Sequence, residues 1–291
     1  MKKINQASLS RLYGVSVFLF VLLGATLIQI VSAQELTYTF ENATLSGPKT
    51  IAVNGFRDIS FVNNSDTELD MSVARLHDGA TRQNYISVDK AINDALSAEE
   101  GDARQPIGEL ISLADAVGGV HLASDTQGSA YLKLEPGRYL VTAASGGGPG
   151  DPYKPTYLNV TVTEGERAEA PTADFSLHMV DFHFDFPETM RAGEQLWEVA
   201  NTGSQPHFAL IFRLLEGKTA EDVTAWMTDF SGPPPVEFEG GAFVQGLTSG
   251  QTYYTPVTLM PGTYVAVCPL PNLATGEPHF ADGMVSTFTV Q

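Results

Sequence analysis

The sequence predicts an all-β protein made of two antiparallel, Greek-key β-sandwich domains, each with a short inserted helix. Short segments rich in β-branched and aromatic residues alternate with turn residues, and the 291-residue chain contains 27 Gly and 17 Pro. Many short strands separated by such turns are typical of β-sandwiches. The second half of the chain also repeats motifs of the first, which indicates two domains built on one plan.

The first 33 residues are expected to be a signal peptide. Three basic residues precede an apolar run over residues 12–31, and a Val-Ser-Ala sequence ending at Ala33 is a small-residue cleavage site. An uncleaved membrane anchor is the alternative, because the apolar run is longer than most signal-peptide cores. Cleavage after Ala33 predicts export to the periplasm or the extracellular space, with a membrane contact only if the segment stays uncleaved.

The net charge limits the classes of partner of the mature chain, and the cysteine content limits the state of its thiol. Residues 1–33 hold three of the 16 basic residues and none of the 34 acidic ones, so the mature formal charge is 13 − 34 = −21. Such a surface repels nucleic acid and anionic lipid. It suits a basic protein partner, and the alternative is that it serves only solubility in a salty medium. The single cysteine, Cys268, cannot form an internal disulfide, so after export it is expected to be buried, paired between chains or bound to a metal.

An internal repeat relates the two halves. A gapless alignment of the first motifs pairs Asn63 with Asn201, Arg75 with Arg213, and Gly79 with Gly217. A Leu-x-Pro-Gly-x-Tyr motif occurs at residues 134–139 and again at 259–264. Helix-like stretches follow the first motifs at residues 88–99 and 219–230. The repeat therefore predicts two sandwiches, each with an inserted helix.

The expected domains are residues 34–162 and 175–291, joined by an acidic, Pro-bearing linker over residues 163–174. In the second domain, residues 181–186 alternate as a half-buried strand does, with three Phe on one face and Asp181, His183 and Asp185 on a solvated face. Its other expected strands cover residues 197–201, 207–215, 252–259, 262–268 and 284–290.

One constellation carries metal chemistry. Cys268, His279 and Met284 occur in one loop between two expected strands, and His207 stands where a turn feeds another strand. A thiolate, a thioether and two imidazoles suit copper, whereas zinc rarely takes a thioether, and calcium and magnesium prefer oxygen ligands. Each residue alone also fits an ordinary role, Cys268 and Met284 in the core and the two histidines in surface loops.

These motifs resemble those of the cupredoxins, the small blue copper proteins. The resemblance covers residues 175–291 and rests on a turn ending in Pro-His207, a Pro-Gly-x-Tyr strand ending in Cys268, and a closing His279-x4-Met284. It implies one copper ion per chain in a mononuclear type 1-like site, with His207, Cys268 and His279 in the plane and Met284 as the weak axial ligand. Ten residues separate Cys268 from His279, where small electron carriers usually have two to four.

The resemblance also implies electron transfer through the edge of His279. A redox protein partner, basic in charge, would dock near His279 on an apolar patch formed by Pro269, Leu270, Pro271, Leu273 and Phe280. The alternative is an exported cupredoxin-like protein that serves as a binding or structural module, or that sequesters copper, with no redox role.

The first half lacks the ligands and the chain lacks catalytic motifs. By the alignment, Leu69 stands in the place of His207 and Ala143 in the place of Cys268, so residues 34–162 are expected to be a degenerate domain without copper. Six histidines with no His-x-His pair are too few for further copper centres, and no small-molecule substrate is evident. The chain is therefore expected to be an electron carrier or binding protein and not an enzyme.

Overall fold

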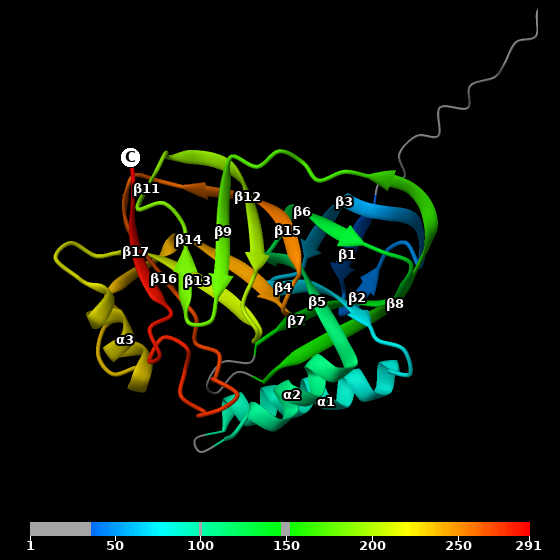
Figure 1. Ribbon diagram of the computed structural model, residues 1–291, viewed down its shortest axis with the longest axis horizontal. Helices are drawn as coiled ribbons and strands as arrows, with labels where there is room; N and C mark the ends of the chain where they lie inside the picture. The colour runs from blue at the N-terminus through cyan, green and yellow to red at the C-terminus, as the bar shows by residue number, and fades with distance from the viewer. Residues whose placement is uncertain (1–35, 99–100, 147–151) are drawn as a thin grey trace, which may run out of the picture. The chain divides into compact units, whose positions relative to one another are not determined.

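The computed structural model describes residues 36–98, 101–146 and 152–291 (Figure 1). The expected signal peptide lies outside these described residues. Residues 35–291 form one compact unit, and in its described part no helix is long and apolar enough to cross a bilayer.

The first half forms two sheets from eight strands, which are β1 Thr37–Glu41, β2 Thr44–Ser46, β3 Thr50–Asn64, β4 Leu69–Leu76, β5 Ala114–Leu122, β6 Thr126–Leu134, β7 Gly137–Ser145 and β8 Lys154–Ala168. One sheet has β3 between β1, which is parallel to it, and β6, which is antiparallel. The other has the order β5-β4-β7-β8, all antiparallel. β8 continues to Ala168, so the strand occupies the start of the segment expected as a linker.

The second half repeats this arrangement with strands β9 Phe175–Val180, β10 His183–Asp185, β11 Thr189–Met190, β12 Gly193–Asn201, β13 His207–Leu214, β14 Val236–Leu247, β15 Thr252–Leu259, β16 Gly262–Val267 and β17 Val285–Val290. In one sheet β12 lies between parallel β9 and antiparallel β15. The other sheet has the order β14-β13-β16-β17. The predicted all-β class with two sandwich domains is confirmed. The sheets are mixed rather than purely antiparallel, because β1 and β8 lie parallel to β3 and β9 lies parallel to β12.

The two halves meet through their edge strands. β14 pairs with β5 at Leu247 and Val117, and β15 pairs with β6 at Tyr253 and Tyr254. Tyr253 is fully buried, and its hydroxyl accepts a hydrogen bond from the Gln245 N–H at 2.9 Å. Edge strands present unpaired N–H and C=O groups, and pairing each edge with its counterpart satisfies part of both. The sheets of the two halves are therefore continuous at these points.

Matched side-chain contacts explain why the repeat motifs recur. Asn63 donates two Nδ2–H bonds, to Thr67 O at 2.8 Å and Ala123 O at 2.9 Å. Asn201 makes the equivalent pair, to Gln205 O at 2.8 Å and Leu247 O at 2.9 Å. Each Asn closes the turn before a central strand, where its amide satisfies two backbone carbonyls.

The Pro-Gly-x-Tyr turns are likewise closed in the same way. The Tyr139 hydroxyl donates to Glu135 O at 2.8 Å, and the Tyr264 hydroxyl donates to Met260 O at 2.9 Å. Both tyrosine side chains are buried. The two motifs thus encode the same pair of local structures in each half.

Helices α1 Arg82–Ser97, α2 Arg104–Leu113 and α3 Ala220–Asp229 are inserted between strands. α1 begins six residues before the expected start, because Thr81 accepts a bond from the Asn84 N–H and caps the first turn. α3 matches its expected range, with Thr219 and Asp222 forming a capping box. α2 was not expected, so the first half carries two helices rather than one.

The strand expected over residues 181–186 is broken. β9 ends at Val180, the chain turns at Asp181 and Phe182, and β10 pairs back onto β9 with His183 opposite Val180. Polar and aromatic residues do alternate over residues 181–186, but hydrogen bonds of Asp181 stabilise a turn there in place of a continuous strand. Asp181 accepts hydrogen bonds from the turn that precedes β13, so it does not lie on a solvated strand face.

Candidate metal centre

The predicted ligands lie at the ends of three strands of one sheet. His207 is the first residue of β13, Cys268 directly follows β16, and Met284 directly precedes β17. His279 belongs to the loop between β16 and β17. All four residues are fully buried. Because β13, β16 and β17 are neighbours in the sheet, their ends meet at one end of the sandwich.

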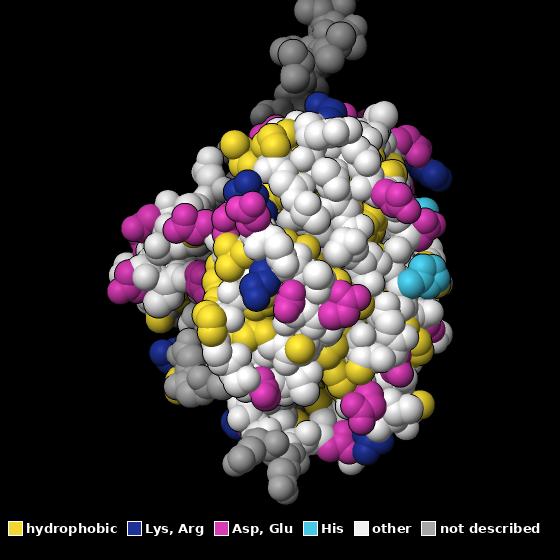
Figure 2. Space-filling view, turned by 90° about the vertical axis from the view of Figure 1, so that its left-hand side faces the viewer, with side chains coloured by type: hydrophobic (Ala, Val, Ile, Leu, Met, Phe, Trp, Pro, Cys, Tyr) yellow, Lys and Arg dark blue, Asp and Glu magenta, His cyan; other side chains and the backbone are white. Residues whose placement is uncertain are grey.

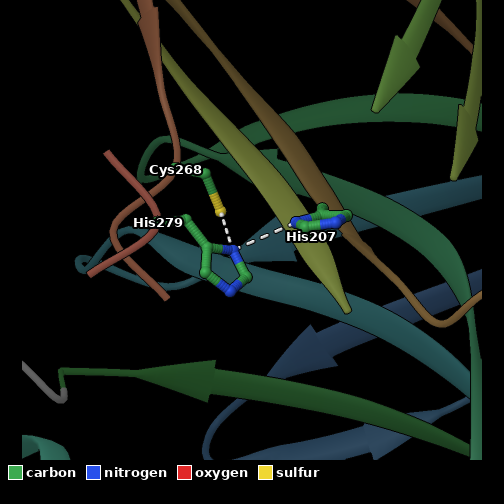
Figure 3. Close-up of side chains that lie close together, drawn as sticks. All are labelled: His207, Cys268 and His279. Carbon is green, nitrogen blue, oxygen red and sulfur yellow. Dashed lines mark hydrogen bonds between the residues drawn. The ribbon is translucent and has the colours of Figure 1, made fainter. Parts of the chain in front are cut away.

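Three donor atoms converge at this point, as Figure 3 shows. The sulfur of Cys268 and one ring nitrogen from each of His207 and His279 all lie within 4.8 Å of one another. Nδ1 of His279 is 3.1 Å from Nδ1 of His207 and 3.5 Å from Cys268 Sγ. His207, Cys268 and His279 therefore form a candidate copper site, since a thiolate with two imidazoles is a donor set that copper favours.

The ten residues between Cys268 and His279 form a side loop whose two ends lie close together. Pro271 and Pro278 form an isolated antiparallel bridge, and the Asn272 N–H donates to Glu277 O at 2.7 Å. The His279 N–H then donates to Leu270 O at 2.8 Å. The long spacing is thus compatible with a compact site, because the extra residues form a closed side loop.

Met284 is held beside the other ligands by backbone bonds. Its N–H donates to His279 O at 2.9 Å, and its carbonyl accepts from the Cys268 N–H at 3.2 Å. Its side chain packs in the same core cluster as Cys268. Its role as the axial ligand stays a prediction, although its place in the loop fits that role.

Asp181 contacts the site and was missed in the sequence. Its Oδ1 lies 2.7 Å from Nε2 of His207, and it also accepts the N–H of Ser204 at 2.8 Å and of Gln205 at 3.2 Å. Burial alone would raise the pKa of Asp181, but these bonds and that of the Ser204 hydroxyl lower the pKa to about 2. The carboxylate holds the proton of His207 on Nε2, which leaves the Nδ1 lone pair facing the centre.

Burial sets the protonation of the other donors. Burial raises the pKa of the Cys268 thiol to about 11. The backbone N–H groups of Phe208 and Leu270 donate to the sulfur and lower this pKa, but their effect is smaller than that of burial. Burial and the neighbouring His207 lower the pKa of His279 to about 4. Burial also lowers the pKa of His207, although Asp181 opposes this. Near neutral pH the copper-free site therefore holds two neutral imidazoles and a protonated thiol.

His279 is enclosed, which differs from an exposed electron-transfer edge. Its Nε2 is buried and has no hydrogen-bond partner among the described residues, and the Phe182 ring packs against it with centroids 5.1 Å apart. Leu270 and Leu273, expected at the surface, pack against a cluster formed by α1 and α2. Helices of the first half therefore cover part of the apolar patch that the sequence placed beside His279.

Substitution of the two matched asparagines is expected to separate folding from metal binding. Asn201→Ala and Asn63→Ala each remove two side-chain hydrogen bonds to backbone carbonyls, so each should lower the free energy of unfolding by about 1–3 kcal/mol. Only Asn201→Ala should also weaken copper binding, because its turn leads into His207. Denaturant unfolding and copper titration of both variants test this. Equal loss of copper affinity in both variants would contradict it.

In its described residues, the first half shows no counterpart of the site. Leu69 begins β4 as His207 begins β13, and Ala143 pairs with Thr156 where Cys268 meets Met284. None of these three residues offers a thiolate or an imidazole. Among the described residues, the only His, Cys, Asp or Glu group able to hold a metal is the cluster in the second half. The cluster of His207, Cys268 and His279 thus lies in the C-terminal half, where the sequence predicted it.

No protein-family model and no curated sequence matches the chain. Solved structures do: dithionite-reduced auracyanin from the photosynthetic bacterium Roseiflexus castenholzii is 22% identical over 40% of this chain and 94% of its own, with a TM-score of 0.26. A multicopper oxidase is 13% identical over 88% of each chain, with a TM-score of 0.24. A copper-containing nitrite reductase from Thermus scotoductus SA-01 is 11% identical over 88% of this chain and 61% of its own, with a TM-score of 0.24.

One expectation is corrected by these matches. The sequence was expected to belong to a protein that is not an enzyme, yet two of the structures that align with 88% of the chain are an oxidase and a reductase. The small number of histidines limits only how many copper centres this chain can hold by itself. It does not decide whether the chain takes part in catalysis. The expectation of no enzymatic activity is therefore withdrawn.

Proposed function

With a cupredoxin-like fold and a candidate copper site as the premise, we propose that this chain binds one copper ion and uses it for single-electron transfer. The observation that carries the proposal is the convergence of Cys268 Sγ and two imidazole nitrogens within 4.8 Å in a fully buried place. Thiolate stabilises Cu(I) and imidazole serves both oxidation states, so copper held there would change its charge by one.

The residues around the donors support this use. Asp181 orients the His207 ring through a 2.7 Å contact, and the backbone bonds of the loop hold Cys268, His279 and Met284 close together. Burial keeps water away from the donors and leaves little room for them to move between oxidation states. Met284 is proposed to complete the set as a weak ligand that tunes the potential.

The proposal includes export of the mature chain. The supporting features are the basic and apolar composition of residues 1–33 and the small-residue site at Ala33. Cys268 is buried at the donor cluster, where copper would occupy it and protect it in an oxidising compartment. A redox protein of basic charge is the proposed partner.

Copper sequestration is the second candidate. The observation in its favour is the burial of His279, whose ring edge is covered where an electron carrier would expose it. A protein that stores copper needs a closed site of soft donors and no path to a partner. The two functions differ in the oxidation states that the site supports.

Titration of the mature protein with Cu(II), followed by visible absorption and electron paramagnetic resonance, tests the proposal. An intense thiolate-to-copper band is expected at one copper per chain, reversible on reduction, and absent in Cys268→Ser. Colourless binding of Cu(I) alone would favour sequestration. Equally colourless wild-type and Cys268→Ser proteins that bind no copper would contradict both functions.

A further inference from the structure

An aromatic cluster lies at the surface of the second half, between α3 and β14. Phe230 follows α3 and Phe238 lies in β14, and their side chains are 57% and 58% exposed. Trp226 of α3 contacts both, with ring centroids 5.1 Å from Phe230 and 6.1 Å from Phe238. Phe212 of β13 packs edge-on against Phe238 at 5.7 Å. Trp226, Phe230, Phe238 and Phe212 are called the aromatic patch below.

This concentration of exposed apolar side chains is unusual. Five large hydrophobic residues are exposed in the described parts of the chain, and three of them, Leu215, Phe230 and Phe238, fall within a segment of 24 residues that borders the patch. Isolated exposed hydrophobic residues are normal on soluble proteins, but a contiguous aromatic group marks a contact surface. Aromatic side chains are also the residues that most often anchor protein interfaces.

Acidic residues surround the patch. Between Leu215 and Gly240 the chain holds six Asp or Glu and one Lys. Several of the acids have local partners, since Asp222 caps α3, Asp229 accepts the Ser231 N–H at 2.9 Å, and Glu237 pairs with Arg213 at 3.0 Å. The face that carries α3 shows hydrophobic side chains among Asp and Glu, with fewer Lys and Arg (Figure 2). An apolar centre with a negative rim is complementary to an apolar centre with a positive rim.

The aromatic patch packs against residues that are next to the metal ligands in the chain. The buried face of α3, through Val223 and Met227, packs in a cluster that also contains Val267 and Phe280. Val267 precedes the Cys268 ligand and Phe280 follows the His279 ligand in the chain. Trp226 packs against the same cluster from its partly exposed position. Through Trp226, the aromatic patch and the residues next to Cys268 and His279 thus share one packed cluster.

We propose that the aromatic patch is the docking surface for a basic protein, which, if the proposed electron transfer holds, is the redox partner of the copper centre. The surface expected from the sequence, beside His279, is partly occupied by α1 and α2. The aromatic patch is uncovered in the described structure. A second copy of this chain is a poor occupant, because its acidic rim would face an equally acidic rim.

Tryptophan signals provide the test. The chain has two tryptophans, and Trp197 is 1% exposed in the core, so its indole N–H signal is an internal control for that of Trp226. Copper-free protein is titrated with a basic c-type cytochrome, and nuclear magnetic resonance follows both signals. The Trp226 signal is expected to shift while that of Trp197 stays, and raising the ionic strength to about 0.5 M should abolish binding by screening.

Variants locate the contact. Phe230→Ala with Phe238→Ala should weaken binding by about tenfold or more, as truncation of interface anchors does. Leu96→Ala is the matched control, because Leu96 is 50% exposed on α1 and lines a surface hollow with Pro269 and Pro271 beside the ligand loop. Its affinity should stay within about twofold of the wild type, since a single exposed side chain outside the contact changes little.

Three results would overturn the proposal. The first is the absence of a Trp226 shift at low ionic strength. The second is a loss of affinity in the Leu96 variant but not in the double variant. The third is a wild-type dimer in sedimentation that is absent in the double variant. Because the titration uses copper-free protein, a failure here is separate from a failure of copper binding. The double variant should retain the wild-type copper absorption, which confirms that its site is intact.

Discussion

Copper affinity is expected to rise about tenfold with each pH unit between pH 5 and pH 9. The Cys268 thiol has its pKa raised to about 11, so it is protonated across this range in the copper-free protein. His279 has its pKa lowered to about 4 and is neutral over the same range. Copper displaces the thiol proton, and each unit of pH then contributes about 1.4 kcal/mol to binding.

Competition for Cu(I) with a chelator of constant affinity over this range measures the slope. Cys268→Ser should bind weakly and with almost no dependence on pH above neutrality, because it has no thiol proton to release. Below about pH 5 the wild-type slope should steepen as protons compete for the imidazoles. A flat wild-type profile would show that Cys268 is not a ligand or is already ionised in the copper-free protein.

Removal of the Asp181 carboxylate is expected to weaken copper binding by about 10- to 100-fold. In Asp181→Ala, Nε2 of His207 loses its 2.7 Å partner, and the N–H groups of Ser204 and Gln205 lose their acceptor. The His207 ring is then free to adopt the other tautomer, in which Nδ1 carries the proton and cannot bind a metal. Copper titration of the variant measures the loss.

Two further variants separate positioning from general damage. Asp181→Asn keeps an acceptor for His207 and should recover part of the affinity. Asp185→Ala removes a carboxylate from the same segment, where Asp185 is exposed on β10, and should bind copper as the wild type does. If Asp181→Ala binds copper normally but unfolds more easily, Asp181 stabilises the turn and does not position the ligand.

Enclosure of the site by the first half gives that half a role. The α1–α2 pair packs against Leu270 and Leu273 of the ligand loop, while edge strands β5 and β6 pair with β14 and β15. The ligand-free half thus supports the loop that holds Cys268 and His279. The first half is therefore in direct contact with the ligand loop of the second half.

Local patterns determined much of this protein from the sequence alone. The Asn turn and the Pro-Gly-x-Tyr turn are closed by contacts within a few residues of each motif, such as Asn201 with Gln205 and Tyr264 with Met260. The places of His207, Cys268 and Met284 at strand ends were likewise visible in the sequence, with His279 in the loop between two of them, because neighbouring strands of a sheet bring their ends together. Both the fold class and the three converging donors were therefore predictable.

Only the tertiary structure decided the surroundings of the site. Asp181 reaches His207 because the chain turns after Val180, and the alternating sequence of that segment indicates a strand instead. Leu270 and Leu273 are covered by α1 and α2, which lie more than 150 residues earlier in the chain. No local sequence pattern indicates which loop these helices contact. Short-range hydrogen bonds can be predicted from residues that are close in the sequence. Burial and pKa values depend on which distant parts of the chain pack together.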